Sequence, residues 1–194
     1  MNALLLFGLL TLNTTVSMWN AYVAGRIWRE CAGWMKAVAW SALVMSVCGF
    51  TSVLTTCFGF VMVATNHLTA HGFKVLEELT YLMIIFPVVG AGLIITIHSW
   101  IEAYKRRDFW SVGGAMYNTF AQVSNTWGAI HDTAPAFSDV FSFFKSDDKD
   151  DNAQSALIAL IVAVALALSV GMTYLLWTAG LKHSVSALAA QRVG

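Results

Sequence analysis

Four long stretches of apolar residues divide the chain, and each is long enough to cross a membrane. They run over 2–25, 34–65, 79–100 and 156–181. A membrane-spanning helix needs about 20 mostly apolar residues, and more when it is tilted. No Asp, Glu, Lys or Arg interrupts these stretches, apart from Lys36 near the start of the second. The pattern therefore predicts an all-α membrane protein with four transmembrane helices.

The first stretch is predicted to be a retained span rather than a cleaved signal peptide. A signal peptide begins with a basic region, which Met1 and Asn2 do not supply. Arg26 and Arg29 follow the stretch, as they do where a transmembrane helix ends. We therefore expect three transmembrane helices within 1–107.

The connection between the third and fourth stretches, 108–155, is amphipathic. One set of apolar residues recurs at the three- and four-residue spacing of a helix: Phe109, Val112, Met116, Phe120, Val123, Trp127 and Ile130. The opposite face is polar but uncharged, with Ser111, Asn118, Gln122 and Asn125. A second apolar set follows Pro135: Phe137, Val140, Phe141 and Phe144. Two interpretations stay open, a helix on the membrane surface and a helix packed against partner subunits.

An acidic linker closes this connection and leads into the fourth helix and short tail, 156–194. It carries Asp147, Asp148, Asp150 and Asp151. A calcium loop of the EF-hand type needs alternate acidic ligands, a glycine and a distal Glu. Lys149 occupies an alternate position and no glycine follows, so we interpret the run as a solvated linker.

Composition confirms the membrane class and excludes others. The 194 residues are 58% hydrophobic and 11% charged, whereas soluble domains carry about 25% charged residues. A soluble enzyme and a disordered chain are therefore excluded. The net charge of zero argues against nucleic-acid binding, which needs a basic face. Three cysteines give no disulfide framework.

Basic residues are spread unevenly over the predicted connections. Two connections carry Arg26, Arg29, Lys36, Lys105, Arg106, Arg107, Lys145 and Lys149, against Lys74, Lys182 and Arg192 on the opposite side. Basic connections usually face the cytoplasm. We therefore expect both termini outside the cytoplasm and 108–155 inside it, in a protein of the bacterial inner membrane.

Small and weakly polar residues form two stripes within the predicted spans. A small residue recurs every four positions in the fourth span, a pattern typical of close helix packing: Ser155, Ala159, Ala163, Ala167 and Gly171. A second stripe in span two falls within about 60° of a helical wheel: Ser41, Cys48, Ser52, Thr55, Gly59 and Asn66. This second stripe is interpreted as a helix–helix seam, with a pore lining as the alternative.

Ionisable side chains near the span ends are the remaining candidates for chemistry. His98 and Glu102 are four residues apart near the end of span three, where they could form a proton relay or an interfacial ion network. A metal could be bound by His67, His71 and His183 with Glu77 or Glu78. A haem could be bound by His67 with His183, or by His98 with His131. No motif supports these sites, so no metal or cofactor is predicted.

The function that this pattern favours is a non-enzymatic subunit of a larger membrane assembly. Its partners would be the lipid bilayer and other membrane subunits of the same or another kind, as in a secretion or conjugation apparatus. A homo-oligomeric channel lined by the span-two stripe is the first alternative. A haem- or metal-binding redox anchor is the second.

Overall fold

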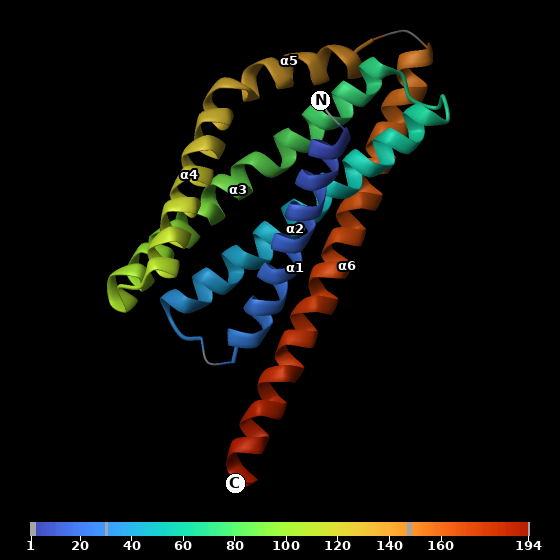
Figure 1. Cartoon of the computed structure of the whole chain (residues 1–194). Helices are drawn as coiled ribbons and strands as arrows, with labels where there is room; N and C mark the ends of the chain where they lie inside the picture. The colour runs from blue at the N-terminus through green and yellow to red at the C-terminus, as the bar shows by residue number, and fades with distance from the viewer. Residues whose placement is uncertain (1–2, 30, 147–148, 194) are drawn as a thin grey trace.

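Six α-helices make up the part of the chain that the structure describes. The computed structural model describes residues 3–29, 31–146 and 149–193, and the side chains of all of these except 3, 149 and 184–193. The helices are α1 (Ala3–Ile27), α2 (Trp34–Ala64), α3 (Ala70–Arg106), α4 (Phe109–His131), α5 (Thr133–Phe144) and α6 (Lys149–Val193) (Figure 1).

Four of these helices, α1, α2, α3 and α6, are long and apolar enough to cross a membrane. The helices α4 and α5 lie between the third and fourth candidate spans. The predicted all-α fold with four such helices and a helical connection is therefore confirmed. Asn2, Asp147 and Asp148, which entered the predictions, lie outside the described residues.

The third helix begins earlier in the chain than the apolar pattern predicts. It starts at Ala70 rather than near Leu79, because Thr69 caps it by accepting a hydrogen bond from the Gly72 amide at 3.0 Å. The added turns carry Lys74, and they place a charged segment beyond the apolar core of the helix. With 37 residues, α3 is about 55 Å long, which exceeds a hydrocarbon core of about 30 Å.

The direction of α6 differs from the predicted topology. Thr69 donates two hydrogen bonds to Gln154 Oε1, at 3.0 and 2.7 Å, so α6 begins beside the start of α3. Its far end reaches the end of α1, where the Trp177 backbone lies against Gly25. The start of α1 and the end of α6 therefore lie at opposite ends of the bundle (Figure 1). The sequence predicts both termini on one side of the membrane, whereas in the structure they lie at opposite ends of the bundle, because α4 and α5 run back along α3.

Basic residues concentrate at one end of the bundle and acidic residues at the other. The basic end comprises the ends of α1, α3 and α6 and the start of α2, with Arg26, Arg29, Lys36, Lys105, Arg106, Arg107 and Lys182 beside Glu102 and Asp108. The acidic end comprises the α2–α3 turn, α5 and the start of α6, with Glu77, Glu78, Asp132, Asp139, Asp150 and Asp151 beside Lys74 and Lys145. Lys145 and Lys182 thus lie at the ends opposite to those predicted.

Side chains pack in one apolar cluster near each end. At the acidic end, α2, α3, α5 and α6 contribute to a buried cluster around Leu76, Phe143 and Ile158. At the basic end, Ala24 and Ala39 are buried, with Trp177 packed against them. Helices in lipid associate through close packing rather than through exclusion of water. The fit between α1 and α6 therefore depends on small residues, because a Cβ atom on Gly25 would overlap the Trp177 carbonyl.

Replacing Gly25 with valine should separate α1 from α6 and destabilise the bundle. We expect a loss of about 1–3 kcal/mol, the usual effect of overpacking a tight contact. Gly8→Val is the matched control, because a Cβ atom at Gly8 meets nothing within 4 Å. Thermal unfolding in detergent, followed by circular dichroism, measures the difference. Equal Tm values for the two variants would contradict this packing.

Candidate functional site

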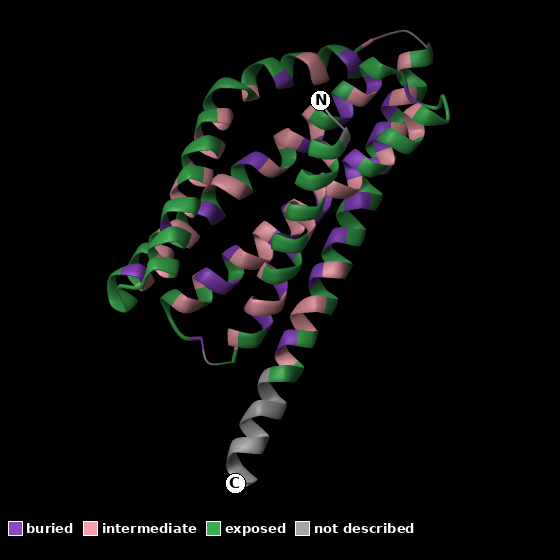
Figure 2. Cartoon of the chain, viewed as in Figure 1, coloured by how far each residue is buried: buried purple, intermediate pink, exposed green. Residues whose placement is uncertain are grey.

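The small-residue row predicted in the fourth span lies on the outside of α6. Of its five members only Ser155 is buried, whereas Ala159, Ala163, Ala167 and Gly171 are exposed. Within the chain α6 packs through a neighbouring stripe that includes Ile158, Val162, Ala165, Ser169 and Thr173. Exposed positions follow the outward side of α6 along its length (Figure 2). No helix in the described part of the chain therefore covers the four exposed members, which we call the outer α6 row.

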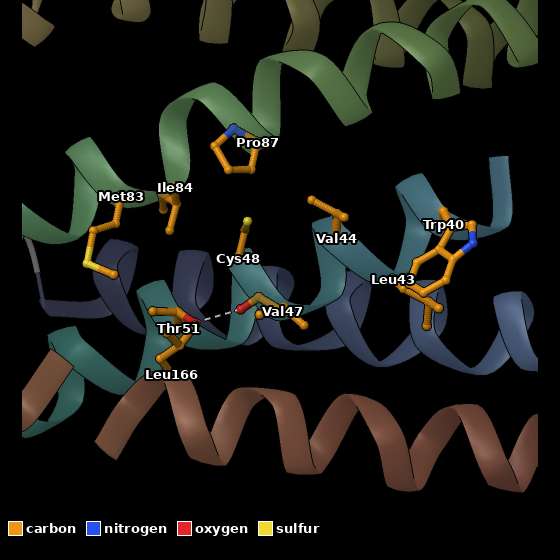
Figure 3. Close-up of a pocket in the computed structure, with 10 residues that line it drawn as sticks. All are labelled: Trp40, Leu43, Val44, Val47, Cys48, Thr51, Met83, Ile84, Pro87 and Leu166. Atoms are coloured by element: carbon orange, nitrogen blue, oxygen red, sulfur yellow. Dashed lines mark hydrogen bonds between the residues drawn. The ribbon is translucent and has the colours of Figure 1, made fainter. Parts of the chain in front are cut away.

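An apolar groove opens between α2, α3 and α6 (Figure 3). Its volume is about 420 Å³, and its walls are Trp40, Leu43, Val44, Val47, Cys48, Thr51, Met83, Ile84, Pro87 and Leu166. The hydroxyl of Thr51 already donates to the Val47 carbonyl at 2.8 Å. Apart from the Cys48 thiol and the Met83 thioether, the walls are otherwise hydrocarbon and indole. The groove therefore suits an apolar occupant.

A second groove of about 380 Å³ continues the first along α6. The two grooves share Trp40, Leu43 and Val47, and the second adds Val170, Tyr174 and Trp177 among its walls. The outer α6 row runs alongside. Ala163, Ala167 and Gly171 each precede a groove residue (Leu166, Val170 and Tyr174) by three positions, a spacing that makes neighbours on a helix surface. The row and the two grooves form one surface, which we call the α6 face.

The span-two stripe lies mostly inside the bundle. Ser41, Cys48, Thr55 and Gly59 are buried, Ser52 is half-buried and Asn66 is exposed in the α2–α3 turn. The Thr55 hydroxyl donates to the Thr51 carbonyl at 2.9 Å, one turn back. A Cβ atom on Gly59 would meet the Phe73 ring of α3. The chain's own helices therefore cover most of this stripe.

A buried hydrogen bond joins α2 to α6 and was not predicted. The hydroxyls of Ser46 and Thr173 lie 3.0 Å apart, and both residues are buried. The helical wheel of α2 assigned its polar residues to a different stripe, which omits Ser46. Nothing in the local sequence pairs two residues 127 positions apart. This pair is the polar contact that aligns α6 on α2.

His98 and Glu102 do not form a pair. Glu102 contacts Lys105 at 3.4 Å and Arg106 at 3.3 Å, so its carboxylate belongs to an ion network at the basic end. His98 Nδ1 is buried and has no hydrogen-bond partner among the described residues. The geometry corresponds to the interfacial network rather than to a relay between the two side chains.

The remaining histidines divide between the two ends of the bundle. His67 Nδ1 lies 2.9 Å from the Thr65 carbonyl oxygen at the acidic end, and the His71 ring meets the Phe143 ring there. The His183 ring lies 6.4 Å from the Tyr22 ring at the basic end, so the pairing of His67 with His183 is wrong.

His98 and His131 do not meet either. His131 ends α4, whereas His98 is next to Ser99, whose contact on α4 is Asn118, 13 residues and about 20 Å before His131. The described residues hold no group of three or more His, Cys, Asp or Glu that could bind a metal.

An ion pair holds α5 against α3 at the acidic end. Lys74 Nζ lies 2.6 Å from Asp139 Oδ2 and 3.3 Å from Glu78 Oε1. The hydrogen bond from Lys74 and its positive charge keep the pKa of Asp139 below the ordinary carboxyl value. Both partners are substantially exposed, so the pair positions α5 more than it stabilises the bundle.

Comparison with protein-family models, curated proteins and solved structures found no match.

Breaking the Ser46–Thr173 bond should weaken the contact between α2 and α6. Ser46→Ala and Thr173→Val remove one hydroxyl each, and the double variant removes both. Because hydrogen bonds between transmembrane helices average about 0.6 kcal/mol, we expect a coupling energy of about 0.6–1.7 kcal/mol. Unfolding of the four proteins in a mixed micelle, analysed as a double-mutant cycle, measures it. Strictly additive effects would contradict a direct bond.

Acid should loosen α5 through Asp139. A carboxyl whose pKa is lowered by folding stabilises the folded state above its unfolded pKa of about 3.9 and loses that contribution as pH falls through the lowered value. Hydrogen exchange of α5 amides should therefore increase on acidification through that range, after correction for the intrinsic exchange rate. In Asp139→Asn the same amides should exchange faster at neutral pH and lose this pH dependence. An unchanged profile in the variant would show that the pair does not hold α5.

Proposed function

We propose that this protein is a non-enzymatic integral membrane subunit of a larger membrane assembly, which docks a transmembrane helix of another subunit through the α6 face. The observation that carries the proposal is that the outer α6 row is exposed while α6 packs on its own chain through other residues. The row is continuous with two apolar grooves. The row and the two grooves together form a surface with hollows rather than a smooth one.

On such a surface, small residues at every fourth position favour contact with another helix over contact with lipid. They let two helix backbones approach closely, so that van der Waals contact replaces contact with acyl chains. A row of this kind runs obliquely around a helix, and partner helices that follow it cross at about −40°. Larger side chains of the partner would then enter the neighbouring grooves beside Trp40, which is 57% exposed.

The wider setting is an assembly of the bacterial inner membrane, such as a secretion or conjugation apparatus. The span-two stripe gives less support to a homo-oligomeric channel. Ser41, Cys48, Thr55 and Gly59 are covered by other helices of the same chain, so they do not present a surface to a shared axis. A subunit that docks a partner helix does not need polar residues around a shared axis.

Bulky residues on the outer α6 row should release the partner. The double variant Ala163→Leu with Ala167→Leu places two large side chains where the backbones meet, at a cost of about 1–3 kcal/mol for each misfit. Gly113→Leu is the control, because Gly113 is exposed on α4, away from α6, and a Cβ atom there meets nothing within 4 Å. The measurement is extraction from native membranes in mild detergent, followed by native gel separation and identification of co-purifying proteins.

We expect the wild-type protein and Gly113→Leu to migrate with the same partners. The double variant should retain them at least tenfold less, since about 1.4 kcal/mol corresponds to a factor of ten. Recovery of the wild-type protein as a lone monomer would overturn the assembly itself. Equal recovery of partners by the double variant and the control would overturn docking through the α6 face.

A further inference from the structure

The helix α4 carries its polar side chains on the inside and its apolar side chains on the outside. Asn118 Nδ2 donates to Ser99 Oγ at 2.6 Å, and Gln122 Nε2 donates to the Val89 carbonyl at 3.0 Å. The Trp100 indole donates to Thr119 Oγ1 at 2.9 Å. The polar face of α4 is therefore bonded to α3.

The opposite face of α4 is exposed along its whole length. It consists of Phe109, Val112, Met116, Phe120, Val123, Trp127 and Ile130, with exposed fractions from 38% to 81%. A helix at the surface of a soluble protein shows the reverse arrangement, with its apolar stripe on the core. An apolar face turned outward, with amide groups that donate inward to a neighbouring helix, is the arrangement that hydrocarbon surroundings favour.

Charge and length also fit a helix inside a bilayer. No Asp, Glu, Lys or Arg occurs between Phe109 and His131, which are the bounds of α4. Its 23 residues make it about 34 Å long, and a hydrocarbon core is about 30 Å thick. Asp108 caps the start of the helix by accepting a hydrogen bond from the Ser111 amide, so charge lies just beyond the segment.

The direction of the neighbouring helices supplies an independent argument. The end of α3 lies at the basic end of the bundle, whereas the start of α6 lies beside Thr69 at the acidic end. If α3 and α6 both cross the membrane in this arrangement, the chain between them must cross it as well. The helix α4 is the element that runs that course beside α3 (Figure 1).

We propose that α4 crosses the bilayer as a fifth span and that its exposed apolar face contacts lipid acyl chains. The start of α1 and the end of α6 then lie on opposite sides of the membrane. The basic end would face the cytoplasm, because Lys and Arg concentrate on that side of membrane proteins. The aromatic helix α5 lies at the outer interface, with Phe137 and Phe141 exposed.

Pairing with α3 explains why the apolar pattern alone does not reveal this span. Asn118, Gln122 and Asn125 lower the mean hydropathy of α4, and an amide without a partner in hydrocarbon costs several kcal/mol. Two of these amides donate to α3. Gly92 leaves the room for Gln122, because a Cβ atom there would overlap the amide oxygen.

The first test locates α5 relative to the two loops. Single cysteines replace Ala32 in the α1–α2 loop, His67 in the α2–α3 turn and Ser138 in α5, all exposed positions, in a variant without the three native cysteines. A membrane-impermeant maleimide is applied to intact cells and to inverted vesicles. With five crossings, the Ser138→Cys and His67→Cys variants are labelled from one side and Ala32→Cys from the other. Labelling of Ser138→Cys together with Ala32→Cys would overturn the proposal.

The second test measures the surroundings of α4 directly. A nitroxide is attached at a cysteine replacing Phe120, which is 76% exposed, in protein reconstituted into phosphatidylcholine vesicles. Paramagnetic relaxation compares collisions with oxygen, which concentrates in lipid, and with a water-soluble nickel complex. We expect the oxygen effect to exceed the nickel effect by several-fold at Phe120, and the reverse at Ser138, the matched position on α5. A nickel-dominated signal at Phe120 would overturn the membrane position of α4.

Discussion

A polar group that this protein takes into the bilayer has partners only within the protein, and much of the bundle follows from that constraint. Water is not available to complete a hydrogen bond in hydrocarbon. Thr51, Thr55 and Thr80 donate to carbonyls one turn back on their own helices. Ser46 and Thr173 share a bond between α2 and α6, and Asn118 and Gln122 reach α3. Hydroxyl and amide contacts between helices therefore help to select which helix faces meet, while apolar side chains are free to face lipid.

Helix periods and apolar lengths predict the number and nature of the helices well, because those properties are local. They predict the direction of the last helix poorly. The end of the bundle at which α6 begins depends on the path of α4. The amide side chains of α4 lower its hydropathy, so the sequence pattern predicts a segment in water. Only the contacts of Asn118 with Ser99 and of Gln122 with Val89 show that the amide nitrogens of these side chains donate to α3. A pattern read along one helix cannot contain that information.

The fourth-span row shows a second limit of sequence reasoning. The small residues are correctly recognised, and Ser155 does pack inside the bundle. Ala163 and Ala167, however, lie at least 100° around α6 from the buried Val162 and Ala165. Both stripes contain small residues at helical spacing, so composition cannot decide which of them meets the chain's own helices. Steric fit decides, through close contacts such as that between Gly25 and Trp177.

The separation of charge between the two ends of the bundle couples the protein to the electrical state of its membrane. The chain has no net charge, yet it is positive at one end and negative at the other. Moving one elementary charge across 100 mV changes the free energy by about 2.3 kcal/mol. If the basic end faces the negative, cytoplasmic side, as we propose, a resting potential opposes inversion of the protein. Loss of that potential would remove this energy while leaving every contact between the helices intact.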